Sequence, residues 1–438
     1  MTNPCRRSPG LRALAACLLA SGCTSTAHVQ APVARIADAW HAPLPHGGRT
    51  SDLVSWWATF KDPSLTALIG YAEAESPSLE SAAADIDKAR ATLASSQASL
   101  LPSLDGSASL SRSGTGGDQA NRVTASTTRS GGLDASWELD LFGKVRQQRD
   151  AARARVGEQI ANWHDARVSL AAEVADYYIQ YRACRQIENA YAIELASQKE
   201  TIRATETAAT SGLTSSADLA LARASAASSS STLTAQHAEC EVLVKSLAQV
   251  TGGDEPRVRQ SLAAGRSALP RPKSFALQAV PADALRQRPD INALEAEVAA
   301  SLADLGAAKA DLYPSFSLSG SLTVNSSSLT GASVPWSFGP ALSVPLFDGG
   351  SRRAAVRSAQ ADYDVAVAEY KSGVLDAVSE IETALVRVDS TRRQIGDAAI
   401  AARNYRSYFN SIDANWKAGG ASLLDREDAR RSAQSAEI

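Results

Sequence analysis

Four residues near the carboxyl end of the chain are spaced so that they could act together electrostatically. Leu424, Asp425, Asp428 and Arg431 fall within two helical turns, and Asp428 lies three positions before Arg431. Opposite charges at this spacing on a helix can form an ion pair, which could latch neighbouring helices at a narrow mouth. A solvated helix face explains the same charges nearly as well. Two other arginines are weaker candidates for the latch, Arg430 and Arg223.

Two glycine-containing segments are expected to turn the chain between helices. Gly212 ends one helical pattern, and Ser215 with Asp218 has the spacing of a capping box that starts a new helix. Gly419 and Ser422 repeat this arrangement, again with an aspartate three positions after the serine. The sequence therefore predicts two helical hairpins with tips at about residues 212 and 419.

Cys184 and Cys240 lie at equal distances from the first of these turns. Each is 28 residues from Gly212, so an antiparallel hairpin places the two at the same height. In an oxidising compartment such a pair can form a disulfide. The alternative is two buried free thiols, because an unpaired cysteine is often a small core residue.

The sequence gives no sign of an active site. The five histidines are scattered without metal-ligand spacing, and there is no G-x-S-x-G, phosphate-binding loop or paired-cysteine metal motif. We therefore expect no catalysis, no metal and no cofactor.

The N-terminal segment predicts export. Basic residues and a short apolar run, 11–20, precede Ser21, Gly22 and Cys23, which is the arrangement of a secretory signal. The run LLASGC resembles a bacterial lipoprotein processing site. That resemblance implies removal of residues 1–22, acylation of Cys23 and, with Thr24 next, sorting to the outer membrane. Plain cleavage after small residues is the alternative.

Composition points to long helices. The chain is rich in Ala and Ser and poor in Phe and Met, which favours closely packed helices over a bulky core. Its formal net charge of −3 gives no basic surface for nucleic acid. After the signal, no run reaches the roughly 18 apolar residues of a membrane helix, so any membrane crossing must use strands.

The chain contains an internal repeat. Pro77 and Pro102 correspond to Pro289 and Pro314, which lie 212 residues later in similar sequence surroundings. Each half is expected to contain a helix, a strand pair, a long helix, a turn and a helix. The expected segments are a lipid-anchored linker at 23–50, the first repeat at 51–250, a linker at 251–280 and the second repeat at 281–438.

Strand pairs are expected at about 102–141 and 314–347. Apolar residues or glycine alternate with polar residues from Leu104 to Leu110 and from Phe316 to Val324. Segments of about ten residues match a tilted membrane strand. Four strands cannot close on themselves, so in lipid several chains must share one barrel. Three chains give twelve strands and a lumen, which is the arrangement we expect; soluble hairpins that cover a core are the alternative.

The helices carry heptad spacing, which indicates coiled packing into a helical barrel. The first series is Leu170, Val174, Tyr177, Tyr181 and Cys184, and the second is Val374, Val378, Ile381, Leu385 and Val388. The pattern from about Lys144 to Thr210 contains one glycine and no proline, so this helix should be unusually long.

The segments WWATFKDPSLTALI, SWELDLFGKVR, DLYPSFSLSGSL and GPALSVPLFDGG resemble the outer-membrane factors, the TolC- and OprM-like ducts of efflux pumps, and most of all their NodT-type lipoprotein branch. The resemblance covers almost all of the mature chain. It implies a homotrimer in outer-membrane lipid, a twelve-stranded barrel and a helical periplasmic tunnel. It also implies tips that meet a membrane-fusion adaptor and a proton-driven inner-membrane pump of the resistance-nodulation-division class.

The same resemblance places a closed iris at Leu424, Asp425, Asp428 and Arg431. Arg426 and Glu427 depart from it, because apolar residues are usual there, and the sequence stops at Ile438 where relatives continue. A duct for type I protein secretion and a non-conducting coiled-coil scaffold are the alternatives to an efflux duct.

Overall fold

The computed structural model of the chain describes residues 56–115, 124–265, 268–272 and 285–438. Cys23 and the segments 1–22 and 23–50 lie outside the described residues.

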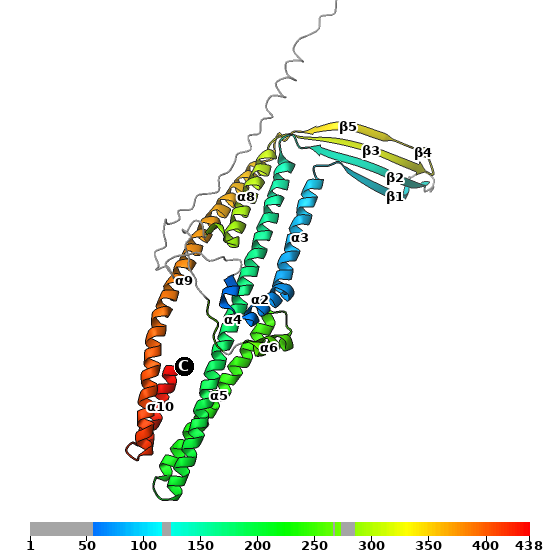
Figure 1. Ribbon diagram of the computed structural model, residues 1–438. Coiled ribbons are helices and arrows are strands. Elements are labelled where there is room, and N and C mark those ends of the chain that lie inside the picture. Colours follow the sequence, from blue (N-terminus) through cyan, green and yellow to red (C-terminus); the bar gives the residue numbers. More distant parts are fainter. Residues whose placement is uncertain (1–55, 116–123, 266–267, 273–284) are drawn as a thin grey trace, which may run out of the picture. The chain divides into compact units, whose positions relative to one another are not determined.

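The first half of the described chain runs from short helices through two strands into a long helical hairpin (Figure 1). Its elements are η2 (Trp56–Phe60), α2 (Pro63–Glu75), α3 (Pro77–Ala98), β1 (Ser103–Thr115), β2 (Thr124–Leu139), α4 (Lys144–Thr210), α5 (Ser216–Val250) and α6 (Glu255–Ala264).

The second half follows a similar order. Its elements are α8 (Pro289–Ala310), β3 (Ser315–Ser327), β4 (Gly331–Ser333), β5 (Trp336–Ser343), α9 (Ser351–Lys417) and α10 (Leu423–Glu437). The long helices α4 and α9 both have 67 residues, about 100 Å at the usual helical rise. None of the described helices combines the length and the apolar character that a membrane span requires.

Local chemistry sets where the helices begin. A proline stands in the first turn of α2, α3 and α8, where its missing N–H costs no hydrogen bond. Gly143 and Gly350 precede α4 and α9 with φ of 85° and 91°, a conformation that glycine adopts without strain. Asp140 accepts hydrogen bonds from two N–H groups in the first turn of α4.

Helix α6 lies within the segment 251–280 that is expected to link the two repeats. Asp254 caps its first turn, accepting a hydrogen bond from the N–H of Arg257 at 3.2 Å. Val258 and Leu262, one turn apart, are buried against the core. Ten residues of this segment are therefore a packed helix.

The main apolar core lies where α2, α5 and α6 pack against the middle of α4. Tyr178 is fully buried there and donates a hydrogen bond from its hydroxyl to Asp62 Oδ2 at 2.7 Å. The other oxygen of Asp62 caps α2 through the N–H groups of Ser64 and Leu65. Burial, together with the bond to Asp62, raises the pKa of Tyr178 to about 12.

The heptad series locates this core only in part. Leu170, Val174 and Cys184 are buried, but Tyr177 and Tyr181 are half-buried, and Tyr178 takes the central position instead. The buried face therefore follows the 3.6-residue period of a straight helix more closely than a 3.5-residue period. In α9, Val374 and Leu385 are buried, Val378 and Ile381 are half-buried, and Val388 is exposed.

The strands form one antiparallel sheet in the order β1, β2, β3, with β4 and β5 on the far side of β3. Residues that face each other across neighbouring strands project to the same side of a sheet. Leu133 pairs with Gly106 on β1 and with Leu322 on β3, and Leu322 pairs with Trp336 on β5. The register therefore collects the apolar side chains on one face and leaves the serines on the other.

Alternation predicts four strands, and the described residues form five. β4 and β5 occupy the same side of β3, and Pro335 lies between them. The expected strand pair at 314–347 thus corresponds to β3 and β5, and β4 is an additional short strand beside them. The carbonyl of Pro335 accepts a hydrogen bond from the N–H of Thr323 at 3.0 Å.

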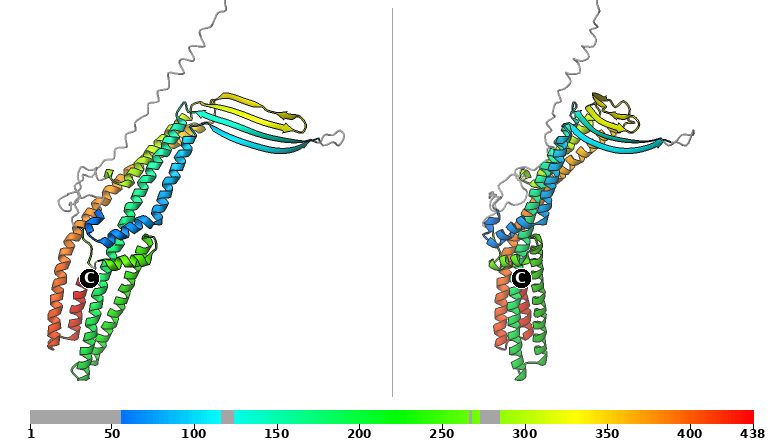
Figure 2. Two further views of the ribbon diagram at one scale, coloured as in Figure 1. Left: turned by 45° about the vertical axis from the view of Figure 1, so that its right-hand side comes forward. Right: turned by 90° about the vertical axis from the view of Figure 1, so that its right-hand side faces the viewer.

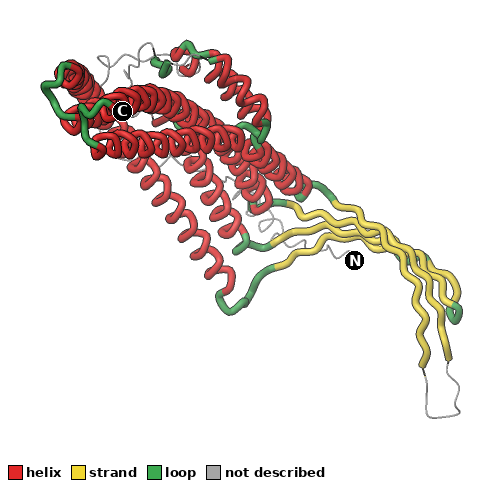
Figure 3. The backbone as a smooth tube through the Cα atoms, turned by 90° about the horizontal axis from the view of Figure 1, so that it is seen from below, coloured by secondary structure: helices red, strands yellow, loops and turns green. Residues whose placement is uncertain are grey.

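No described helix covers the apolar face of this sheet. Figures 2 and 3 show the strands extending beyond the ends of the helices. Trp336 and Phe338 are 75% and 70% exposed, and Leu104, Leu110 and Leu342 are similarly bare. Within the described residues, one edge of β1 and one edge of β5 have no strand partner.

Tyr178→Phe should destabilise the core by about 1–3 kcal/mol, because the buried Asp62 oxygen loses its donor. Tyr177→Phe is the matched control, since Tyr177 is half-buried and makes no hydrogen bond through its hydroxyl within the described residues. Chemical denaturation measures both. Equal losses in the two variants would contradict this role of the Tyr178 hydroxyl.

Candidate functional site

Both hairpin tips are built from the same local elements. Gly212 and Gly419 have φ of 70° and 79° and end α4 and α9. At the first tip, Ser215 Oγ accepts from the N–H of Asp218 at 3.1 Å, and Asp218 accepts in return from the N–H of Ser215 at 3.2 Å. Hydrogen bonds, first of all from the serine side chain, lower the pKa of Asp218.

The second tip repeats this arrangement with the same distances between Ser422 and Asp425. The pKa of Asp425 is also lowered, chiefly by the hydrogen bond from the Ser422 side chain. The structure thus places Asp425 in a helix cap, with its carboxylate committed to Ser422.

Helix α10 presents two different faces. The candidate residues Leu424, Asp428 and Arg431 lie on the exposed face, where Arg431 forms an ion pair with Asp428. The buried face consists of Leu423, Arg426, Glu427, Ala429, Arg430 and Ala433. The candidate ion pair therefore lies on the surface of the chain, while three charged residues lie beneath it.

Arg426 ties α10 to both long helices. Its Nε lies 2.6 Å from Asp413 Oδ1 on α9, and its Nη1 donates to Thr201 Oγ1 on α4 at 2.7 Å. The guanidinium stacks over the ring of Trp416, 4.5 Å from the centroid. Burial alone would raise the pKa of Asp413, but hydrogen bonds from Lys417 and Arg426 lower it.

Arg430 completes this buried charge cluster. It pairs with Glu427, and its Nε lies 2.9 Å from Glu194 Oε1 on α4. Burial lowers the pKa of Arg430 to about 10, with Glu194 opposing the shift and Arg426 adding to it. The side chain therefore stays charged near neutral pH, and its two carboxylate partners are needed to offset the cost of burying it.

Arg223, the other weaker candidate, contributes elsewhere. Its Nη2 lies 2.8 Å from Glu206 Oε1, an exposed pair between α5 and α4. It joins the two arms of the first hairpin and is not part of the α10 cluster.

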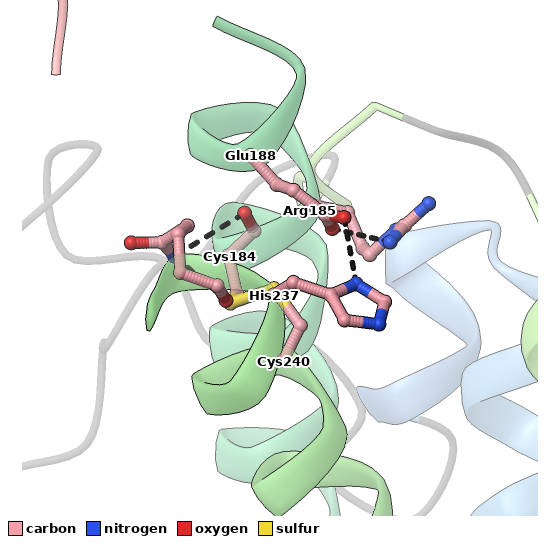
Figure 4. The surroundings of a disulfide bond; sticks show 6 residues. Cys184, Arg185, Glu188, His237 and Cys240 are labelled. Atoms are coloured by element: carbon pink, nitrogen blue, oxygen red, sulfur yellow. Dashed lines mark hydrogen bonds and ion pairs between the residues drawn. A yellow bond between two sulfur atoms is a disulfide. The ribbon is translucent and has the colours of Figure 1, made fainter. Parts of the chain in front are cut away.

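A disulfide joins those arms farther from the tip. Cys184 and Cys240 are bonded, with a Cα–Cα distance of 5.6 Å (Figure 4). Gln236 Nε2 lies 3.0 Å from Cys184 Sγ. The carboxylate of Glu188 contacts the side chains of both Arg185 and His237. In the described part of the chain, no group of three or more His, Cys, Asp or Glu side chains could hold a metal ion.

Sequence reasoning located the turns and caps but treated Arg426 and Glu427 only as departures from a pattern. The signal for their burial is periodicity, because Arg426, Glu427 and Arg430 share a helical face with Leu423 and Ala433. Charged residues on a short helix are usually expected to face solvent. The sequence does not show that these are buried, because their partners on α4 are more than 200 positions away.

The chain is similar to several known proteins over nearly its full length. A sequence profile described as outer membrane efflux protein matches residues 68–253 and 280–438. Nodulation protein T of Rhizobium leguminosarum bv. trifolii is 30% identical, over 95% of this chain and 89% of the relative. Outer membrane protein OprJ of Pseudomonas aeruginosa is 29% identical, over 97% and 90%.

Solved structures show the same similarity. The CmeC outer membrane channel of Campylobacter jejuni superposes with a TM-score of 0.83 at 25% identity, over 93% of this chain and 89% of the other. The outer-membrane channel OprN gives a TM-score of 0.80 at 30% identity, over 93% and 94%.

Replacing both cysteines, Cys184→Ser with Cys240→Ser, should lower stability by about 2–4 kcal/mol, because the disulfide closes a long loop in the unfolded chain. Thermal unfolding with and without reductant measures this. Reductant should lower the midpoint of the parent protein and leave the double variant unchanged. A midpoint in the parent that is insensitive to complete reduction would contradict a stabilising role.

Arg430→Met should cost about 3–5 kcal/mol, because it leaves the carboxylate of Glu194 without its cation and Glu427 with Arg426 alone. Arg431→Met is the matched control, one position away, since the Arg431 side chain is 71% exposed against 3% for Arg430. Its loss should be below about 1 kcal/mol. Chemical denaturation compares the two, and equal effects would contradict a buried cluster.

Proposed function

Because the chain belongs to the outer membrane efflux protein family, we propose that it is the outer-membrane duct of a tripartite efflux pump. It conducts drugs or other small solutes passively from the periplasm to the exterior. The energy comes from an inner-membrane pump of the resistance-nodulation-division class, and a periplasmic membrane-fusion adaptor joins the two. The family consists of transport proteins, and the proposed role requires no catalytic group.

One observation carries this proposal: the sheet has an apolar face that nothing in the described chain covers. Exposed side chains such as Trp336, Phe338 and Leu104 would be unfavourable in water, whereas lipid accommodates them. The opposite face carries serine and threonine, with Asp105 paired to Asp134, and suits a water-filled lumen.

The open edges of the sheet support a homotrimer. Unpaired backbone groups are not tolerated in lipid, so the free edges of β1 and β5 must pair with other strands. Three copies complete a closed barrel, with β4 and β5 together forming its fourth strand in each chain. Acyl chains on Cys23, palmitate among them, would anchor each copy in the same membrane.

The second tip is the proposed iris. Leu424, Asp428 and Arg431 lie on the free face of α10, next to the turn at Gly419 and Ser422. The charge cluster on the buried face fixes the rotation of α10 about its own axis. Three such faces around the axis would narrow the mouth, and the adaptor and pump would dilate it. The first tip turns at Gly212, Ser215 and Asp218. We expect it to contact the same adaptor and pump.

Leu318→Asp tests whether the apolar face meets lipid. Leu318 pairs with Trp137 and Pro340 on that face, and a carboxylate there should prevent assembly, since charge on the lipid side costs about 2–4 kcal/mol at mid-depth. Ser319→Asp, one residue along on the other face, should assemble normally. The readout is the heat-resistant oligomer in purified outer membranes. Normal assembly of Leu318→Asp would argue against a lipid-facing sheet.

Asp428→Ala should raise single-channel current in planar bilayers, because Arg431 loses the partner that holds it in place. Glu200→Ala is the control, since Glu200 forms a similarly exposed pair with Arg203 three positions later on α4. An unchanged current in Asp428→Ala would favour a plain solvated face. A parent protein that never conducts would contradict the duct itself.

A further inference from the structure

A pocket of roughly 360 Å³ lies where α4 meets the last turn of α6, beside the disulfide. Three arginines line it, Arg182 and Arg185 from α4 and Arg259 from α6, together with Tyr181 and Gly265. None of the residues that line the pocket is acidic. The residues that line the pocket therefore include three cations and no anion.

Arg182 is the unusual member of this set. It is only 5% exposed, and among the described residues no carboxylate lies within ion-pair distance of it. Its guanidinium stacks on Tyr178 and donates from Nη2 to the carbonyl of Leu262 at 3.0 Å. Its Nε has no acceptor in the described chain. The nearest carboxylate, Asp62, reaches Arg182 only through the Tyr178 hydroxyl. A buried cation without a carboxylate in direct contact is costly, which favours a ligand that supplies one.

The other two arginines are held by carboxylates that lie outside the pocket. Arg185 pairs with Glu188 through Nη1, and Arg259 pairs with Glu241 and Glu255 at 2.6 and 2.8 Å. These contacts fix the side chains while leaving Arg185 with free donors. The disulfide joins α4 and α5 next to these contacts, because Cys184 precedes Arg185 and Cys240 precedes Glu241. The pocket is therefore preorganised.

Gly265 keeps the pocket in this form. A Cβ atom at this position would lie 1.9 Å from Arg182 Nη2 and 2.8 Å from Ser64 Oγ. Any side chain would therefore push the guanidinium away from the wall that it now forms. The close approach of backbone and arginine needs glycine at residue 265.

We infer that this pocket binds a small-molecule oxyanion, a carboxylate or phosphate group, through Arg182 and Arg185. Guanidinium groups form paired, charge-assisted hydrogen bonds with the planar oxygens of a carboxylate and with those of a phosphate. Arg259 adds positive charge at the rim, and the ring of Tyr181 forms an apolar side. The site does not depend on conduction, so its failure and that of the proposed duct are separate results.

Isothermal titration calorimetry on the full-length protein in detergent tests this, with inorganic phosphate and succinate titrated separately. At least one should bind saturably and more weakly as sodium chloride is raised. Binding of phosphate alone, succinate alone or both identifies the group that is recognised.

Arg185→Gln should weaken that binding at least about tenfold, because a charge-assisted pair is lost. Arg203→Gln removes an exposed arginine elsewhere on α4 and should leave binding unchanged. Gly265→Ala should also weaken binding, through Arg182, without touching Arg185. Absence of saturable binding to the parent protein, or equal binding by the Arg185 and Arg203 variants, would overturn the site.

Discussion

The arrangement of this chain depends on an apolar sheet face that the chain itself leaves bare. Strand register places Leu133, Leu322 and Trp336 on one side, and no described helix packs over them. Burying apolar surface is the main favourable term in folding. An exposed apolar face of this size therefore requires lipid or another protein surface against it. The free edges of β1 and β5 add a second requirement, which only further strands can meet.

The position of the sheet determines where the long helices begin. Each strand pair is flanked by a helix that ends and a 67-residue helix that begins, so both long helices start at the same end of the sheet. They bury few large side chains outside the core around Tyr178, and the exposed face of α9 carries Ile395, Ile400 and Tyr405. In the proposed trimer, neighbouring helices would cover that face. The disulfide and the α10 cluster supply fixed points where apolar packing within one chain is thin.

The sequence predicted those features that depend on local chemistry or on counting. The glycine turns at 212 and 419 and the serine–aspartate caps require only a few adjacent residues, and equal distances from Gly212 place Cys184 opposite Cys240. Alternation located the strands because the side-chain period of a strand is two. It did not predict the short strand β4.

The remaining features depend on partners distant in the sequence. Arg426 and Arg430 are buried because Thr201 and Glu194 lie opposite them, which no local pattern records. Tyr178 rather than Tyr177 fills the core because the Tyr178 hydroxyl donates a hydrogen bond to Asp62, which caps another helix. Helix α6, within the expected linker, was not predicted, and its ten residues bury only two apolar side chains.

The most direct test of this account is the number of chains in the assembled particle. Native mass spectrometry of the protein, extracted from outer membranes in mild detergent, measures it. The account predicts a particle of three identical chains that stays together until the detergent is made denaturing. A single chain that is soluble and monodisperse without detergent would contradict it, because its apolar sheet face would then have to be buried within itself.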